Sequence, residues 1–138
     1  MSETTDFLIK DRVLIQYLKE DAIAITLPEG ISKIADGVFW SFVELQSIEF
    51  PASLREIGEY AFRNCRKLTC VIFPEGMKHL GYWAFYACRN LQTAVIPASV
   101  SEIERGAFEI CPLLTIHAPK GSYAEDYARK NGIKFQSI

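Results

Sequence analysis

Three of the four cysteines recur at one interval, and cysteine is the residue type here that offers the most chemistry. Cys65, Cys88 and Cys111 are 23 residues apart, so they would stack if each interval formed one coil of the chain. Neighbouring Cα atoms would then lie about 4.8 Å apart, inside the range found in disulfides. Three thiols cannot all pair, however, and side chains in register point the same way. Zinc would need every sulfur within about 4 Å of the others, whereas the outer two would be about 10 Å apart. The favoured interpretation is buried free thiols, which act as small apolar side chains and fit a reducing compartment.

His79 offers a second kind of chemistry. It lies 23 residues from both Glu56 and Glu102, and 46 from Lys33, so it is expected between two carboxylates on adjacent coils. Such a group could form a weak metal site or a pH-sensitive contact. A solvated ladder of charges is the favoured interpretation, because exposed ion pairs of this kind are common and weak.

A nucleophile and base pair would have to come from Cys70 and His117. Both are expected on the outer face of strands, where catalysis would require hydrogen-bonding distance between them. They fall two coils apart, about 10 Å at the strand spacing, which excludes a dyad. No Ser–His–Asp group, phosphate-binding loop or dinucleotide-binding motif occurs elsewhere. The sequence therefore predicts that the protein is not an enzyme and has no cofactor, metal or catalytic residue.

The elements that position these residues repeat every 23 residues. The repeat is marked by Pro28, Pro51, Pro74 and Pro97, with Pro119 22 residues later. Two apolar columns with the same period are Phe39, Phe62, Phe85 and Phe108, and Ile34, Ile57, Leu80 and Ile103. So many columns with one period indicate stacked coils, each of which buries its apolar side chains against its neighbours.

Each coil contains a predicted strand and two bends. The residues before each proline alternate, as in Ile48-Glu49-Phe50, which predicts a strand that the proline ends. A Glu-Gly or Ala-Ser turn follows. Gly58 and Gly81 are expected to form a second bend through their backbone freedom.

The two ends of the array have different patterns. The apolar runs at 7–9 and 13–15 flank Lys10-Asp11-Arg12 and predict a β-hairpin over the first coil. At the other end, residues 122–125 form a capping box that begins a helix, with an apolar face of Tyr123, Tyr127 and Ala128. Gly132 is expected to end this helix, and Ile133 and Phe135 to begin a last short strand.

These patterns predict one domain over residues 1–138. A hairpin cap occupies residues 1–21, 23-residue repeats occupy 22–119, and a helical cap occupies 120–138. The predicted fold is an α/β-type repeat solenoid that is mostly β, with about five turns of right-handed coil.

The repeat unit also resembles a known family. The pattern L-x-x-I-x-F-P-x-x-L-x-x-I-G-x-x-A-F-x-x-C, from Leu45 to Cys65, is similar to the BspA-like type of leucine-rich repeat. Residues 118–128 and 7–17 resemble the usual ends of such arrays. The first coil departs from the pattern, with Ala35 for glycine, Val38 for alanine and Phe42 for cysteine. The resemblance implies a leucine-rich-repeat solenoid that binds proteins or adheres to surfaces, often at bacterial or protist cell surfaces, without cofactor or catalysis.

Composition and charge exclude other classes of function. The formal net charge is −2 and the Lys and Arg residues are scattered, so no nucleic-acid partner is expected. No apolar run approaches the roughly 20 residues of a membrane span. Residues 1–6 have acidic side chains and no basic region, so they do not form a secretory signal. The chain as given therefore favours a cytoplasmic location, whereas the resemblance implies a cell-surface or secreted one.

Two surfaces are candidates for binding a partner. The first is the strand face, the outward row that includes Glu49, Ile72, Val95 and His117. Its centre, Ile72 with Val95, is apolar where solvent would be expected, which often marks an interaction site. A homodimer through this face is one option, because self-complementary surfaces are common.

The second surface is the aromatic flank. It consists of Trp40, Tyr60, Tyr82, Trp83 and Tyr86, which flank the buried Ala-Phe pairs. Aromatic side chains dominate binding hot spots, although Tyr60 and Trp83 are expected to pack over neighbouring coils as an outer layer. The sequence therefore predicts a non-catalytic module for recognition of a protein partner. The alternative is a cell-surface adhesion or carbohydrate-binding protein that uses the aromatic flank.

Overall fold

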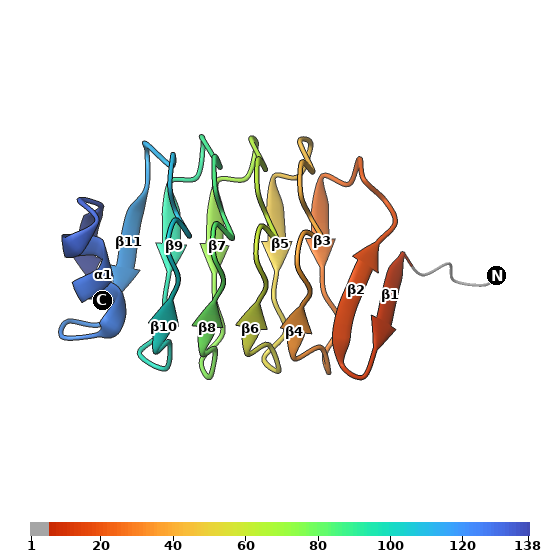
Figure 1. Cartoon of the computed structure of the whole chain (residues 1–138), viewed down its shortest axis with the longest axis horizontal. Helices are drawn as coiled ribbons and strands as arrows, with labels where there is room; N and C mark the ends of the chain where they lie inside the picture. Colours follow the sequence, from red (N-terminus) through yellow and green to blue (C-terminus); the bar gives the residue numbers. More distant parts are fainter. Residues whose placement is uncertain (1–5) are drawn as a thin grey trace.

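Each 23-residue repeat forms two short strands on opposite sides of one coil (Figure 1). This arrangement is seen in the computed structural model of the chain, which describes residues 6–138. The strands of the first row are β3 (Ala24–Thr26), β5 (Ser47–Glu49), β7 (Cys70–Ile72), β9 (Thr93–Val95) and β11 (Thr115–Ala118). Those of the second row are β4 (Lys33–Ile34), β6 (Glu56–Ile57), β8 (His79–Leu80) and β10 (Glu102–Ile103). The predicted mostly-β solenoid is confirmed. The second row was not predicted, because a two-residue strand is too short to show alternation.

The core is built from columns of identical or similar side chains. Consecutive rings of Phe39, Phe62, Phe85 and Phe108 stack with centroids 4.9, 4.8 and 5.5 Å apart. Strands of the second row pair in parallel with a register of 23 residues, so that Ile34 lies opposite Ile57 and Ile57 opposite Leu80. The spacing of the rings therefore matches the spacing of paired strands, about 4.8 Å.

Gly58 and Gly81 have a different role from the predicted one. The prediction that they supply backbone freedom is wrong, because neither is among the residues with positive φ. Both are buried, and a Cβ on Gly81 would lie 2.8 Å from the carbonyl carbon of Gly58. A Cβ on Gly58 would lie 2.8 Å from the backbone nitrogen of Asp36. Glycine is therefore required here by the close approach of neighbouring coils.

The N-terminal end carries the predicted hairpin. Its strands β1 (Phe7–Lys10) and β2 (Val13–Tyr17) pair antiparallel. β2 also pairs in parallel with β4, so the hairpin forms the edge of the six-stranded sheet of the second row. The residues on which the absence of a secretory signal rests lie largely outside the described part of the chain. Within residues 6–138, no helix is long and apolar enough to cross a membrane.

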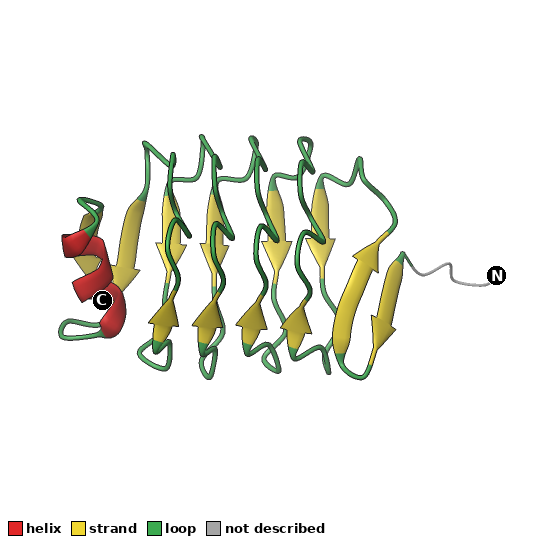
Figure 2. Cartoon of the chain, in the orientation of Figure 1, coloured by secondary structure: helices red, strands yellow, loops and turns green. Residues whose placement is uncertain are grey.

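The C-terminal end carries the predicted helix and strand, α1 (Tyr123–Lys130) and β12 (Lys134–Ser137) (Figure 2). Ser122 accepts a hydrogen bond from the Glu125 N–H at 3.2 Å, and Gly132 follows the helix with a φ of 68°. The predicted apolar face is confirmed for Ala128, which is buried, and for Tyr127, which packs against the core, but Tyr123 is 42% exposed and Ala124 is buried in its place. Small side chains let the helix lie close to the last coil.

The first row of strands is not one continuous sheet. β3 pairs with β5, whereas β7, β9, β11 and β12 form a separate sheet, and within the described residues no pairing joins β5 to β7. The interruption coincides with Phe50 and Phe73, whose rings stack with centroids 5.6 Å apart. That distance exceeds the usual strand spacing of about 4.8 Å. The expected single ladder is therefore broken after β5.

Candidate binding surfaces

The aromatic flank is a continuous stack of rings along the solenoid. The Trp40 and Tyr60 rings lie 5.3 Å apart at 25°, and the Tyr60 and Trp83 rings 5.3 Å apart at 11°. Tyr82 leans against Trp83, with centroids 5.8 Å apart. The expected packing of Tyr60 and Trp83 over neighbouring coils is seen. Trp40 and Tyr82 remain 46% and 40% exposed, so the stack also presents ring surface to solvent.

The backbone beneath this stack is strained. Tyr60 and Trp83 have φ values of 58° and 51°, in the left-handed region that disfavours residues with a Cβ. The same position in the coils on either side is Gly37 or Gly106, with φ values of 69° and 72°. A Cβ on Gly106 would collide with the indole of Trp83. This column thus has glycines at its two ends, where they avoid strain, and aromatic residues at its two central positions, where they do not.

Arg63 is the flank residue that sequence reasoning missed. Its guanidinium carbon lies 4.6 Å from the Trp40 ring centre, 5.3 Å from that of Tyr60 and 5.2 Å from that of Tyr86. Guanidinium groups over aromatic faces are held by cation–π attraction. The signal was available, because Trp40, Arg63 and Tyr86 occupy one column at the 23-residue period. From here on the aromatic flank includes Arg63.

Only some of the residues predicted for the strand face lie next to one another. Ile72 is 62% exposed and lies opposite Val95, which in turn lies opposite His117. Val95 and His117 are both half-buried. Glu49 is exposed on β5, beyond the break in the sheet, so it belongs to a different ladder from the other three.

The cysteine thiols are free and mostly buried. Each member of the stacked column donates to a phenylalanine carbonyl of the preceding coil: Cys65 to Phe39 at 3.2 Å, Cys88 to Phe62 at 3.1 Å, and Cys111 to Phe85 at 3.2 Å. Burial raises the pKa of the Cys88 thiol well above its usual value and that of Cys111 to about 12. Cys88 and Cys111 therefore keep their protons at neutral pH.

Cys70 and His117 are not brought together as a dyad. Cys70 lies opposite Thr93, and Thr93 lies opposite Thr115, so the two candidate residues are on strands two apart in the ladder. Burial also raises the pKa of the Cys70 thiol, which disfavours the nucleophilic thiolate.

His79 lies in the predicted charge ladder but has a further partner. It is opposite Glu56 and Glu102 in the paired strands, as expected. Its Nε2 donates to Glu104 at 2.9 Å, a contact that the 23-residue columns did not reveal. The hydrogen bond from His79 holds the pKa of the Glu104 carboxyl below its usual range. Ligand atoms of His79, Glu102 and Glu104 all lie within 4.8 Å of one another, which is close enough to hold a metal ion.

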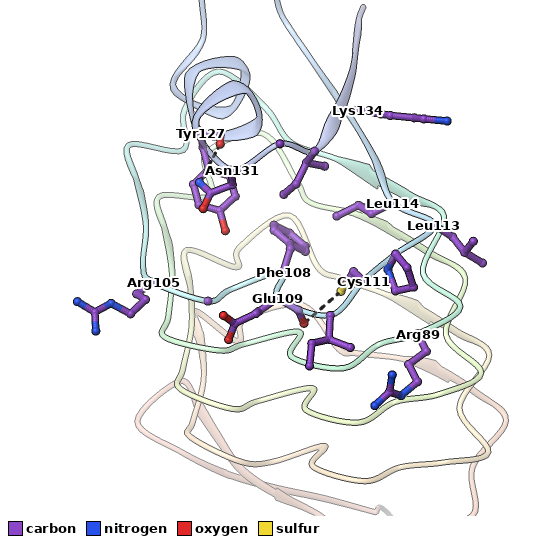
Figure 3. Close-up of a pocket in the computed structure, with 15 residues that line it drawn as sticks. Arg89, Arg105, Phe108, Glu109, Cys111, Leu113, Leu114, Tyr127, Asn131 and Lys134 are labelled. Carbon is purple, nitrogen blue, oxygen red and sulfur yellow. Dashed lines mark hydrogen bonds between the residues drawn. The ribbon is translucent and has the colours of Figure 1, made fainter.

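A hollow lies at the C-terminal end, between the last coil and α1 (Figure 3). It has a volume of about 860 Å³, with Phe108 and Tyr127 inside it and Arg89 and Arg105 at its edge. Its wall includes Ile110, a β-branched residue with a φ of 58°, which is a rare conformation for such a side chain. The column of this residue, Ser41, Asn64, Ala87 and Ile110, shows one branched side chain after three small or polar ones, and that signal was overlooked.

A smaller hollow of about 330 Å³ lies beside Trp40 at the N-terminal end. Gln16, Glu20 and Asp36 contribute polar groups to its wall. The ring and guanidinium partners of Trp40 come from the following coil, whereas most of this wall comes from the hairpin and the first coil. Trp40 is therefore part of both the aromatic stack and the wall of this polar recess.

Comparisons with known proteins agree with this architecture. The sequence profile described as BspA type Leucine rich repeat region matches residues 17–133 in six copies. The solved structure of a T. pallidum leucine rich repeat protein is 26% identical, with a TM-score of 0.66 over 82% of this chain and 68% of that one. A leucine rich cell surface protein from Faecalibacterium prausnitzii is 27% identical, with a TM-score of 0.66 over 91% of this chain and 38% of that one. No curated protein sequence gave a significant match.

A leucine-rich repeat protein from Bacteroides ovatus is 22% identical, with a TM-score of 0.71 over 97% of this chain and 42% of that one, and it supports the fold alone. The chain thus spans less than half the length of two of these three proteins. Repeat proteins of this type commonly bind proteins or occur as surface repeats, and they are generally non-enzymatic. Since the profile matches residues 17–133, which is most of the chain, the chain belongs to the BspA-type leucine-rich-repeat family.

Proposed function

We propose that this chain is a non-catalytic module that binds a protein partner through the aromatic flank. The observation that carries the proposal is the left-handed backbone of Tyr60 and Trp83. Glycine is used at the same position in Gly37 and Gly106, so the turn itself does not need a side chain. A residue with a Cβ in this region costs about 1–2 kcal/mol. Retained strain of this kind is concentrated at functional sites.

The shape of the flank suits a protein better than a small molecule. The Tyr60 ring has Trp40 on one face and Trp83 on the other, so it presents an edge within an extended surface. Small molecules prefer concave and mostly apolar pockets. Trp, Tyr and Arg are the residue types most enriched in binding hot spots, and Arg63 lies among three rings of this flank.

Tryptophan fluorescence gives a direct test, because both tryptophans of the chain, Trp40 and Trp83, lie in the flank. Proteins captured by the immobilised chain from an extract of its source organism would be purified and titrated against it. A flank-binding partner should change the emission at saturation. Arg63→Ala should weaken its affinity about tenfold or more, as expected for a hot-spot residue.

A matched change on the strand face supplies the control. Ile72→Glu alters an exposed side chain away from the flank and should leave both affinity and emission change intact. If Ile72→Glu abolishes binding while Arg63→Ala does not, the partner binds the strand face and the flank proposal is wrong.

The second candidate is carbohydrate binding in a surface adhesion protein. The recess beside Trp40 favours it, since an indole ring there adjoins the polar groups of Gln16, Glu20 and Asp36. A similar structure is described as a leucine rich cell surface protein, which is consistent with this candidate. A panel of soluble oligosaccharides would be titrated while tryptophan emission is recorded. Saturable quenching that is lost in Trp40→Ala and kept in Arg63→Ala would favour carbohydrate over protein.

A further inference from the structure

The second row of strands gathers three metal-ligating side chains at one point. His79 on β8 lies directly opposite Glu102 on β10, and these strands are neighbours in the sheet (Figure 1). Glu104 follows Glu102 by two residues, and such residues point to the same side of an extended segment. His79 and Glu102 are therefore fixed by paired strands, and Glu104 directly follows the second of them. This placement is independent of the aromatic flank and of the proposed function.

The distances between the ligand atoms suit a single small cation. His79 Nε2 lies 2.9 Å from Glu104 Oε2 and 3.6 Å from Glu102 Oε1. Zinc binds nitrogen and carboxylate oxygen at about 2.1 Å, which separates two tetrahedral ligands by about 3.4 Å. The two separations from His79 Nε2 differ from that value by about 0.5 Å or less, and all three ligand atoms lie within 4.8 Å of one another. Small rotations of exposed carboxylates can make up such differences.

A group beyond the three ligands also matches a metal site. A histidine that binds a metal usually directs its other ring nitrogen to a carboxylate, which orients the ring. Here the Nδ1 atom of His79 faces Glu56 Oε2 at 4.0 Å, on the side away from Glu102 and Glu104.

Negatively charged side chains surround His79. Three carboxylates, those of Glu56, Glu102 and Glu104, lie within 4.0 Å of one imidazole ring. Within residues 6–138, no Lys or Arg forms an ion pair with any of the three. A cation bound beside His79 would offset the charge of these carboxylates.

We propose that His79, Glu102 and Glu104 form a binding site for a divalent transition-metal ion of the zinc class. The imidazole nitrogen favours zinc over calcium, which takes six to eight oxygen ligands, and over magnesium, which prefers octahedral oxygen. Three protein ligands leave one tetrahedral position, which faces solvent and would hold water or a ligand atom from a partner.

Calorimetric titration of the full metal-free chain with Zn²⁺ tests the proposal. We expect one ion per chain and no comparable binding of Mg²⁺ or Ca²⁺. His79→Gln and Glu102→Gln should each weaken binding at least a hundredfold. Glu56→Gln should weaken it about tenfold, because outer partners typically contribute 10–100-fold. Glu49→Gln, an exposed carboxylate on the other row, should have no effect.

Two controls keep the outcome clear. Cys70→Ser removes the one thiol on the outer strand face and should leave the affinity unchanged, whereas loss of binding would assign the zinc to that cysteine. Glu102 is largely exposed, so Glu102→Gln should fold normally even if His79→Gln does not. Absence of saturable binding in the wild type up to millimolar Zn²⁺, or equal binding by Glu102→Gln, would overturn the proposal.

Discussion

Substitution of Gly81 by alanine tests how closely the coils approach one another. An added Cβ would lie 2.8 Å from the Gly58 carbonyl carbon, 2.9 Å from the Glu59 nitrogen and 2.9 Å from the Ile57 oxygen. Ordinary Cβ contacts begin at 3.4 Å, so the shortfall is about half an ångström against three backbone atoms. Backbone cannot rotate aside as a flexible side chain can. The two coils must therefore separate, or the protein must carry the strain.

The expected cost follows from what that separation disturbs. Overpacking of a filled interior typically costs about 1–3 kcal/mol. Separating the coils also stretches the 2.8 Å hydrogen bond from the Gly81 N–H to the Ile57 oxygen, a bond that contributes about 1 kcal/mol. The lower entropy of alanine in the unfolded chain offsets less than about 1 kcal/mol. We expect Gly81→Ala to lower the free energy of unfolding by about 2–4 kcal/mol and Tm by about 10 °C.

Urea denaturation followed by far-ultraviolet circular dichroism would measure the loss, with Gly121→Ala as control. Gly121 has a positive φ of 83°, but nothing lies within 4 Å of an added Cβ. Its substitution therefore reports the conformational cost alone, about 1 kcal/mol. If Gly81→Ala loses no more stability than Gly121→Ala, the close approach of the coils does not limit the residue at this position, and the reasoning fails.

Three further predictions concern the strand face and the thiols. Light scattering after size exclusion should show a concentration-dependent dimer that Ile72→Glu dissociates, whereas a monomer in both cases would leave the strand face free of self-association. A thiol reagent should modify Cys70 in the folded protein, whereas Cys65 and Cys88 should react only after unfolding; fast reaction of either would contradict their burial. Stability should decline as pH rises from 9 towards 12, because burial raises the Cys111 pKa from 9.0 to about 12 and the folded state keeps the proton that the unfolded chain loses. This contribution is complete below pH 9, and pH-dependent urea titrations should show a weaker decline in Cys111→Ala.

The fold could be predicted because, in a solenoid, contacts between neighbouring coils appear in the sequence as a regular repeat. Residues 23 apart become neighbours, so the column of Phe39, Phe62 and Phe85 in the sequence is also a stack in space. The role of Gly58 and Gly81 was not predictable in the same way. A glycine in the sequence signals either freedom of φ or lack of space, and only the distance to the next backbone distinguishes them. The break between β5 and β7 likewise depends on how two large rings pack.

The candidate sites were predictable only where they follow the same columns. The ladder of His79 with Glu56 and Glu102 was expected from the period and is present. The contact of His79 with Glu104 lies two residues away from that column, so it depends on side-chain reach across the sheet. The positive φ of Tyr60 was not predicted, because an aromatic residue does not normally signal a left-handed backbone. Gly37, at the same position of the preceding coil, is the residue type that does.

The separation of core and surface columns explains where the specificity of this chain resides. Core columns repeat nearly identical side chains, because each coil must present the same interior to its neighbour. Surface columns have no such requirement, so their variation is available for function. The column of Gly37, Tyr60, Trp83 and Gly106 is the most informative one, since its two central residues depart from the glycine that the backbone favours. If only stability mattered, glycine would be expected at all four positions, unless the aromatic residues stabilise the protein by packing against neighbouring coils. Trp83→Gly separates these explanations, because a stack kept only for packing would lose stability without losing a partner.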